Sequence, residues 1–183
     1  MRFVYVMDAM DRVLPDKDTT FAFLRAAQAR GHESLHCEPR DLFVRNGDLY
    51  ARVRQLTVSD SPPHATFGAS SEVRVADVQA VFIRKDPPFD NMYLMTTLLL
   101  ERVRGRTLLI NDPRGLREAN EKLYTLNFAR WMPRTIVTSH EDVIFDFVKE
   151  IGGTGVIKPL DLAGGSGVMM LRTNDENSRA IVQ

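Results

Sequence analysis

The chain lacks disulfide-forming cysteines, long apolar runs and an excess of charge of either sign. Its single cysteine, Cys37, cannot form an internal disulfide and suits the reducing cytoplasm. No apolar run approaches the roughly 20 residues of a membrane-spanning helix, and the N-terminus opens into a strand pattern rather than a signal peptide. The 24 basic and 24 acidic side chains cancel, which argues against nucleic acid or an anionic membrane as a partner. We therefore expect a soluble protein of the cytoplasm.

Two common phosphate-binding motifs are missing as well. A Walker loop needs a lysine and then Ser or Thr after its last glycine, at the start of a helix. Here Gly167 is followed by Val168-Met169-Met170, which is typical of a strand. A dinucleotide fingerprint needs three spaced glycines after the first strand, and the segment Asp8–Arg12 has none. Any nucleotide must therefore be held in another way.

What is present is an alternation of strand and helix patterns, which predicts an α/β fold with a doubly wound sheet. The 183 residues, 44% hydrophobic and 26% charged, suffice for one globular domain, or for one domain and part of another. Asp18 is expected to cap a helix that buries Phe21, Leu24 and Ala27. The other predicted elements are strands at 2–7, 33–38, 78–83, 107–111 and 135–138, a hairpin turn at 46–47, a surface loop at 59–72, helices at 91–102 and 112–131, and a helix opened by a capping box at 139–142.

A glycine-rich turn lies between two short strand patterns at 155–158 and 168–171. Lys158 ends the first of these patterns and faces the turn Gly164–Gly167. Glycines let backbone N–H groups approach an anion closely, and a lysine adds mobile positive charge. The pattern fits a phosphate clamp on a β-hairpin, and it equally fits an ordinary hairpin with a solvent-facing lysine.

The strand pattern at 78–83 runs directly into Arg84–Asp90, which contains two adjacent prolines. Prolines cannot continue a strand, so they hold Arg84 and Asp86 in a stiff turn at the carboxyl edge of the sheet. Asp8 follows the first strand at the same edge, where ligands of open α/β sheets gather. These three side chains are candidate ligand-binding residues.

Three stretches occur in the order and spacing of the bacterial glutathione synthetases: Ile83-Arg84-Lys85-Asp86-Pro87-Pro88-Phe89-Asp90, Asn120-Glu121-Lys122-Leu123 and Val156-Ile157-Lys158-Pro159-Leu160-Asp161. The whole chain resembles that family. The resemblance implies a Rossmann-like pre-ATP-grasp domain with a parallel sheet at 1–119, followed by the incomplete first part of an ATP-grasp domain at 120–183. It also implies a ligase, glutathione synthase, which joins γ-glutamylcysteine to glycine through an acylphosphate, using ATP and Mg²⁺ (or Mn²⁺).

The resemblance further implies a role for each candidate residue, and every role is in binding rather than in catalysis. Lys122 and Lys158 would hold the ATP phosphates, and the glycine-rich turn would be a lid that excludes water from the acylphosphate. Arg84 would pair with a carboxylate of the dipeptide, because a planar guanidinium suits a carboxylate. The implied ATP-binding residues are Lys122, Lys158, Gly164, Gly165, Ser166 and Gly167, and the implied substrate-binding residues are Arg84, Asp86 and Asp8.

By the same resemblance, the metal-binding side chains lie beyond Gln183 and the full-length protein is a homo-oligomer. The tail 178–183 resembles the start of a helix, so we expect the chain to be a fragment that is inactive alone. The family usually has glycine where this chain has Leu162, and the small residues at 165–167 follow in a different order. Both departures bear on how the lid closes.

Each implied role has an alternative. Arg84 could form an ion pair with Asp86 or Asp90 at the surface. Lys122 could be a solvated helix lysine, and Asp8 could cap a turn instead of contacting substrate.

Other functions also remain open. His32-Glu33-Ser34-Leu35-His36 matches the zinc motif H-E-x-x-H, but that motif requires a helix and the local pattern indicates a strand. The chain could also be a non-catalytic nucleotide-binding module that keeps the two lysines. A third possibility is another ATP-grasp carboxylate–amine ligase that accepts a different carboxylate.

Overall fold

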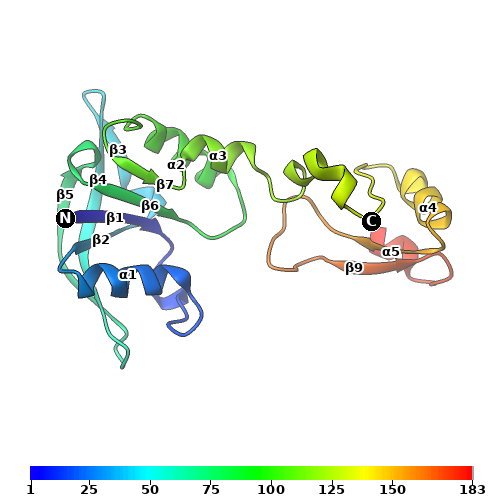
Figure 1. Ribbon diagram of the computed structural model, residues 1–183, viewed down its shortest axis with the longest axis horizontal. Helices are drawn as coiled ribbons and strands as arrows, with labels where there is room; N and C mark the ends of the chain where they lie inside the picture. The colour runs from blue at the N-terminus through cyan, green and yellow to red at the C-terminus, as the bar shows by residue number, and fades with distance from the viewer. Residues whose placement is uncertain (183) are drawn as a thin grey trace. The chain divides into compact units, whose positions relative to one another are not determined.

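The computed structural model describes residues 1–182, apart from the side chain of Arg12, and divides into two compact units, Met1–Glu118 and the residues from Ala119 onward. The first unit contains a seven-stranded sheet in the order β3-β4-β2-β1-β6-β7, with β5 paired to β4 (Figure 1). Its strands are β1 (Arg2–Met7), β2 (Glu33–Cys37), β3 (Leu42–Arg45), β4 (Asp48–Val58), β5 (Ala65–Arg74), β6 (Ala80–Arg84) and β7 (Leu108–Ile110). Its helices are α1 (Thr19–Ala29), α2 (Asn91–Glu101) and α3 (Pro113–Glu118).

Four strands of this sheet, β2, β1, β6 and β7, run parallel to one another. In their register Val4 of β1 lies opposite Leu35 of β2 and Val81 of β6. The long strand β4 pairs antiparallel with β2, β3 and β5. The predicted α/β fold with a parallel sheet is therefore confirmed, and an antiparallel ribbon extends it at one edge.

Strand β1 is buried on both faces, as its continuous apolar run predicts. Val4 and Val6 belong to one core together with Leu100 of α2. Tyr5 belongs to a second core, with Phe21 of α1. All five side chains are at most 1% exposed. The two helices thus cover opposite faces of the sheet.

Helix α1 begins where the sequence predicts. The Asp18 carboxylate accepts hydrogen bonds from the backbone N–H groups of Thr20 at 2.5 Å and Phe21 at 3.3 Å. Gly31, with φ of +68°, follows the last turn in the left-handed region that favours glycine. This placement sets the N-terminus of α1 near the carboxyl edge of the sheet.

The predicted surface loop at 59–72 is wrong over most of its length, because β5 occupies Ala65–Arg74. Its Ser, Ala and Gly side chains are mostly exposed, so the strand lacks the apolar alternation by which strands are recognised. Backbone pairing with β4 defines it instead. The register shifts between Arg54 and Leu56 of β4, opposite Gly68, where an added Cβ would lie 3.2 Å from the Gln55 Cβ. Glycine therefore fits this close approach.

The second unit contains a two-stranded antiparallel hairpin, β8 (Thr154–Ile157) and β9 (Met169–Arg172). Helices α4 (Glu141–Glu150) and α5 (Ser178–Val182) accompany it, together with a 3₁₀ segment, η4 (Tyr124–Trp131). The predicted hairpin and the predicted start of a C-terminal helix are confirmed, although Gln183 lies outside the described residues. No helix among residues 1–182 is long and apolar enough to cross a membrane.

Three predictions in the region before the hairpin are wrong. The helix expected at 112–131 is interrupted after Glu118, because the Asn120 side chain accepts the N–H groups of Lys122 and Leu123 and begins a new turn. Residues 135–138 pair with no strand of the described chain, so their extended pattern alone makes no sheet. Ser139 does not cap α4, whose N-cap is His140 without a side-chain cap.

Candidate functional site

The carboxyl edge of β1 and β6 brings together the candidate residues of the first unit. The parallel register pairs Met7 with Arg84, so Asp8 and Lys85 follow at the same edge. The Asp8 carboxylate accepts a hydrogen bond from the Asp86 N–H at 3.0 Å and lies 3.3 Å from the Lys85 Nζ. Asp8 therefore ties the proline-containing turn to the end of β1.

Arg84 is held by two neutral groups rather than by a carboxylate. Its Nε donates to the Thr20 hydroxyl at 2.9 Å, and its terminal nitrogen donates to the Thr19 hydroxyl at 2.7 Å. Among residues 1–182 it forms no ion pair with Asp86 or Asp90, and the Asp90 carboxylate instead accepts the Tyr93 N–H at the start of α2. The positive charge of Arg84 thus remains uncompensated next to the N-terminus of α1, an arrangement suited to an anion.

Tyr93 lies close to these charges and was not expected from the sequence. Burial raises the pKa of its phenol, and the nearby Arg84 guanidinium opposes that shift. The phenol therefore stays protonated at neutral pH and can donate a hydrogen bond. Thr19 and Thr20 were missed as well; their position directly after the Asp18 cap was the only available signal.

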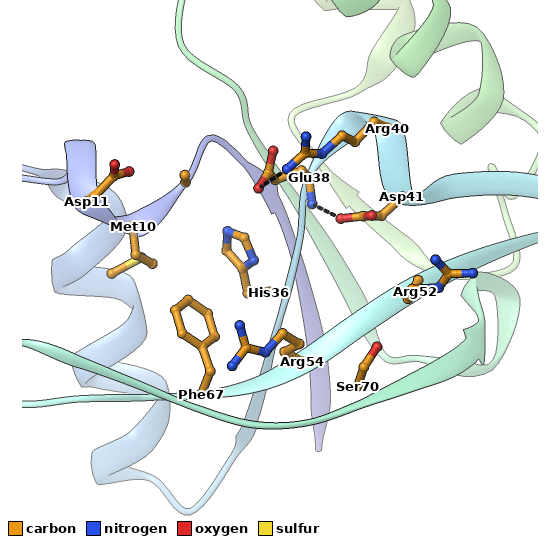
Figure 2. A pocket seen from close by; sticks show the side chains of 11 residues that line it. Met10, Asp11, His36, Glu38, Arg40, Asp41, Arg52, Arg54, Phe67 and Ser70 are labelled. Atoms are coloured by element: carbon orange, nitrogen blue, oxygen red, sulfur yellow. Dashed lines mark hydrogen bonds and ion pairs between the residues drawn. The ribbon is translucent and has the colours of Figure 1, made fainter.

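A cavity of about 440 Å³ opens on the other side of β1, toward β2 and β4 (Figure 2). The buried His36 of β2 places its Nε2 3.2 Å from the Asp8 carbonyl oxygen. Asp11 and Glu38 line one end of this cavity, and Arg54 of β4 lines the opposite end. None of these residues was predicted as a site residue.

In the second unit, Lys158 follows the last pair of the hairpin, Ile157 with Met169. Its side chain is exposed, and its ammonium forms no hydrogen bond or ion pair within the described part of the chain. Gly164, Gly165 and Gly167 have φ angles of +62°, +83° and +67°, respectively. Glycine is favoured at these positions because other residues rarely adopt such angles.

The glycine-rich turn leaves backbone donors free. The N–H groups of Ser166 and Val168 donate to the Ala163 and Gly165 carbonyls at 3.1 and 3.2 Å. By contrast, the N–H groups of Gly164, Gly165 and Gly167 have no acceptor among residues 1–182. A Cβ at Gly164 or Gly165 would meet nothing within 4 Å, so a ligand can approach the backbone there. Successive free N–H groups in such a turn favour anions.

Lys122 reaches the same turn. Its ammonium pairs with Glu121 at 2.9 Å and donates to the Leu162 carbonyl oxygen. The side chain is only 18% exposed, so Lys122 is not a solvated lysine. The structure thus brings Lys122 to the loop that follows Lys158.

Leu162 lies next to Gly167 in this loop, with a side chain that is 38% exposed. A Cβ added at Gly167 would lie 2.8 Å from the Pro159 Cγ and 3.0 Å from the Leu162 Cδ1. The loop therefore closes tightly over Gly167 despite the larger side chain.

No cluster of three or more His, Cys, Asp or Glu residues able to hold a metal occurs in the described residues. His36 of the H-E-x-x-H match lies on β2, and His32 directly precedes that strand, so the motif is not on a helix. Cys37 is buried, and burial raises the pKa of its thiol well above the usual range. The H-E-x-x-H match therefore lacks the helical placement that the zinc motif requires.

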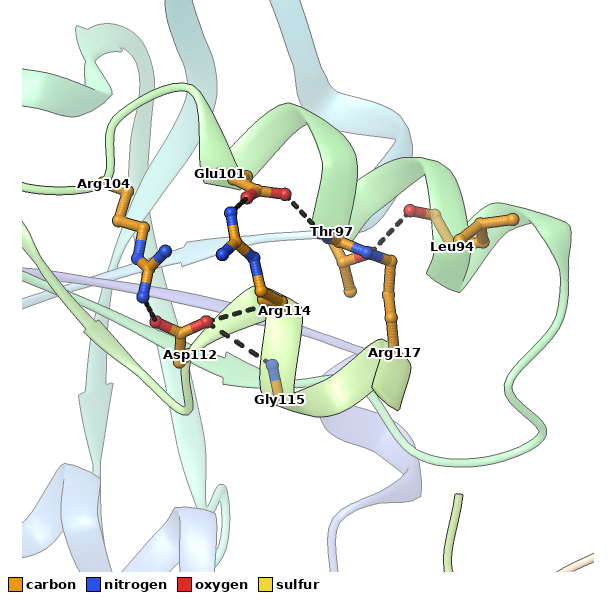
Figure 3. A network of polar contacts seen from close by, with 8 residues as sticks. All are labelled: Leu94, Thr97, Glu101, Arg104, Asp112, Arg114, Gly115 and Arg117. Carbon is orange, nitrogen blue, oxygen red and sulfur yellow. Dashed lines mark hydrogen bonds and ion pairs between the residues drawn. The ribbon is translucent and has the colours of Figure 1, made fainter. Parts of the chain in front are cut away.

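A separate polar network holds α3 against α2 (Figure 3). Glu101 accepts hydrogen bonds from Arg117 and, at 2.9 Å, from Arg114. These bonds, that of Arg117 first, lower the pKa of the Glu101 carboxyl. Arg104 pairs with Asp112 at 3.0 Å. Because every carboxylate of this network is paired, it is structural.

The models of two protein-family domains match consecutive segments of the chain. "Prokaryotic glutathione synthetase, N-terminal domain" matches residues 1–117, and "Prokaryotic glutathione synthetase, ATP-grasp domain" matches residues 121–183. Among curated relatives, the chain is 39% identical over 180 residues to the glutathione synthetase of Yersinia pestis, covering 97% of the chain and 56% of the relative. For the glutathione synthetase of Synechocystis, the identity is 36% over 194 residues, covering 100% of the chain and 60% of the relative.

The chain thus spans a little over half the length of the curated relatives it matches. Among solved structures, it is similar to D-cycloserine synthetase DcsG, with a TM-score of 0.60 and 18% identity, covering 100% of the chain and 53% of that structure. At this identity the similarity shows the fold alone.

Proposed function

We propose a function on one premise: this chain belongs to the prokaryotic glutathione synthetase family. The full-length protein that carries it joins γ-glutamylcysteine to glycine at the expense of ATP, as a carboxylate–amine ligase. Residues 1–119 form the domain that binds the dipeptide, and residues 120–183 begin the ATP-grasp domain. When bound, ATP supplies the phosphoryl group that activates the cysteinyl carboxylate.

The proposed binding of ATP rests on the structure of the loop after β8. Lys122 contacts the Leu162 carbonyl of this loop, and Lys158 begins it with an exposed ammonium. The free N–H groups of Gly164, Gly165 and Gly167 add donors without side-chain bulk. Two ammonium groups and a turn of unpaired N–H groups suit the charge of a triphosphate. Ser166 adds a hydroxyl to the same turn. These residues hold the nucleotide and exclude water from it.

The proposed binding of the dipeptide rests on Arg84. Thr19 and Thr20 fix the guanidinium in place while leaving its charge for a substrate carboxylate. Asp8 positions the turn through the Asp86 N–H, and the exposed Asp86 carboxylate is then available to a hydrogen-bond donor on the cysteinyl part of the dipeptide. Such positioning supplies much of the acceleration in a ligase that must align a carboxylate with a phosphoryl donor.

Magnesium, or manganese in its place, neutralises phosphate charge in transfers of this kind. Its ligands lie in the part of the family that this chain does not span. A substrate with a free thiol suits a reducing compartment, so we place the protein in the cytoplasm. We also retain a homo-oligomer for the full-length protein, with γ-glutamylcysteine and glycine as its small-molecule partners.

The test is phosphate release by the full-length protein. Release should require ATP, γ-glutamylcysteine and glycine together, with glutathione formed in equal amount. Equal turnover with unrelated carboxylates would favour another ATP-grasp ligase. ATP binding without any turnover would favour a non-catalytic nucleotide-binding module.

A further inference from the structure

The cavity between β1, β2 and β4 is not explained by the roles given above. Its volume of about 440 Å³ lies within the range of small-molecule sites. It opens at the carboxyl ends of β1 and β2, on the face of the sheet that α1 covers. Such edges are where open α/β sheets bind ligands.

Several charged groups around the cavity already have a partner within the protein. Glu38 pairs with Arg40 at 3.1 Å, and the Asp41 carboxylate accepts the Glu38 N–H at 3.0 Å (Figure 2). These contacts shape one wall of the cavity. The charged residues of the lining that have no such partner are candidates for binding a ligand.

Arg54 and Arg52 both line the cavity without an ion pair among residues 1–182, and Arg54 is the one that lies opposite His36 in the register of β4 and β2. Its Nε donates to the Gly68 carbonyl at 3.3 Å, and its guanidinium lies 4.4 Å from the centre of the Phe67 ring. Its two terminal nitrogens have no partner in residues 1–182. The stem of the side chain is therefore fixed by β5, while the part that best binds a carboxylate is unused.

Asp11 is a carboxylate of the same lining. Its carboxylate lines the same cavity and has no hydrogen bond or ion pair within the described chain. Asp11 and Arg54 do not pair with each other, and Figure 2 shows His36 between them. Two opposite charges that face one cavity without meeting suit a ligand that carries both charges itself.

His36 adds a directed polar atom. A carbonyl oxygen only accepts hydrogen bonds, so the His36 Nε2 donates to the Asp8 carbonyl, which leaves Nδ1 without a protein partner in this region. The ring packs edge-on against Phe67, with centroids 5.3 Å apart. The imidazole is thus fixed in orientation at the middle of the cavity.

We propose that this cavity binds the zwitterionic α-amino-acid end of the glutamyl residue of the dipeptide. Arg54 binds its carboxylate, Asp11 binds its ammonium, and the fixed His36 orients it. The identity of this ligand rests on the proposed function.

Asp8 explains how one dipeptide can use two subsites. Its carbonyl oxygen contacts His36 on the side of β2, whereas its carboxylate contacts the Asp86 N–H on the side of β6. The glutamyl end therefore lies on one side of β1 and the cysteinyl end lies toward Arg84 on the other. This division makes Arg54 and Asp11 specificity-determining residues, remote from the reacting carboxylate.

The test uses the full-length protein and two trimmed substrates. 4-Aminobutyrylcysteine lacks only the α-carboxylate of γ-glutamylcysteine, and glutarylcysteine lacks only its α-amine. Arg54→Gln should raise the KM for γ-glutamylcysteine about 10- to 150-fold, the range of a hydrogen bond to a charged group. The same variant should leave unchanged the KM for 4-aminobutyrylcysteine and for ATP. Arg45→Gln is the matched control, because Arg45 also stacks on aromatic rings of the sheet but lies outside the cavity.

Asp11→Asn gives the reciprocal result. It should raise the KM for γ-glutamylcysteine while leaving that for glutarylcysteine unchanged, and its exposed side chain makes misfolding a minor concern. If both variants leave the KM for γ-glutamylcysteine unchanged, or raise it equally for the full and trimmed substrates, the cavity assignment is overturned. If the unmodified protein does not turn over γ-glutamylcysteine at all, the proposed function fails instead.

Discussion

Replacing Gly167 by alanine tests whether the loop after β8 is closed by steric fit. The residue has φ of +67°, so any side chain adds about 1–2 kcal/mol of backbone strain. An added Cβ would also lie 2.8 Å from the Pro159 Cγ, closer than real Cβ contacts allow. Such overpacking costs about 1–3 kcal/mol more.

Gly164→Ala is the matched control. Its φ of +62° gives the same backbone strain, but a Cβ there meets nothing within 4 Å. The difference between the two variants therefore isolates the contact with Pro159 and Leu162. That contact should lower the hydrogen-exchange protection of the β8–β9 amides about 5- to 150-fold more in Gly167→Ala than in Gly164→Ala.

The measurement is amide hydrogen exchange by NMR, with the β1–β6 amides of the first unit as an internal reference. Equal loss of protection in both variants would show that the loop does not pack as described. Leu162→Ala in the Gly167→Ala background should restore part of the protection, since it removes one of the two crowding groups.

Three further outcomes are expected. Lys158→Ala should weaken ATP binding about 10- to 150-fold, because it removes the proposed charged contact with a phosphate; calorimetry that finds unchanged affinity would place Lys158 outside the nucleotide site. Arg84→Ala should raise the KM for γ-glutamylcysteine without changing that for ATP, and the reverse pattern in steady-state kinetics would contradict the division of roles. The lowered pKa of Glu101 stabilises the folded state above its unfolded pKa of about 4.5, and that stability is lost as the pH falls through the lower folded value. As the pH is lowered, the unfolding free energy should therefore decrease less steeply for Glu101→Gln than for the unmodified chain.

Local signals in the sequence predict local structure well. The Asp18 cap and the Asn46-Gly47 turn are both present, the latter with φ angles of +52° and +86°. Each depends on a few neighbouring residues whose own chemistry favours the conformation. The first strand is also correct, because burial on both faces leaves an unbroken apolar run.

Elements that depend on a distant partner are predicted poorly. Strand β5 has little apolar character and exists because β4 pairs with it. Residues 135–138 show the opposite case, because they have the sequence pattern of a strand but pair with no strand in the described chain.

The cavity was missed for a related reason. Asp11, His36 and Arg54 come from three separate elements, and no spacing along the chain connects them. The antiparallel pairing of β4 with β2, which sets Arg54 opposite His36 in register, brings two of them together. By contrast, Arg84 and Asp8 could be placed at one edge because both lie at the carboxyl ends of parallel strands.

The contact between Lys122 and the Leu162 carbonyl has a consequence for the proposed binding of a nucleotide. An ammonium has three hydrogens to donate, and here one points to Glu121 and one to Leu162. The third is uncommitted among the described residues. Under the proposed function, the ammonium can therefore bind a phosphate oxygen without releasing the loop, so closure of the loop over the nucleotide and charge attraction can occur together.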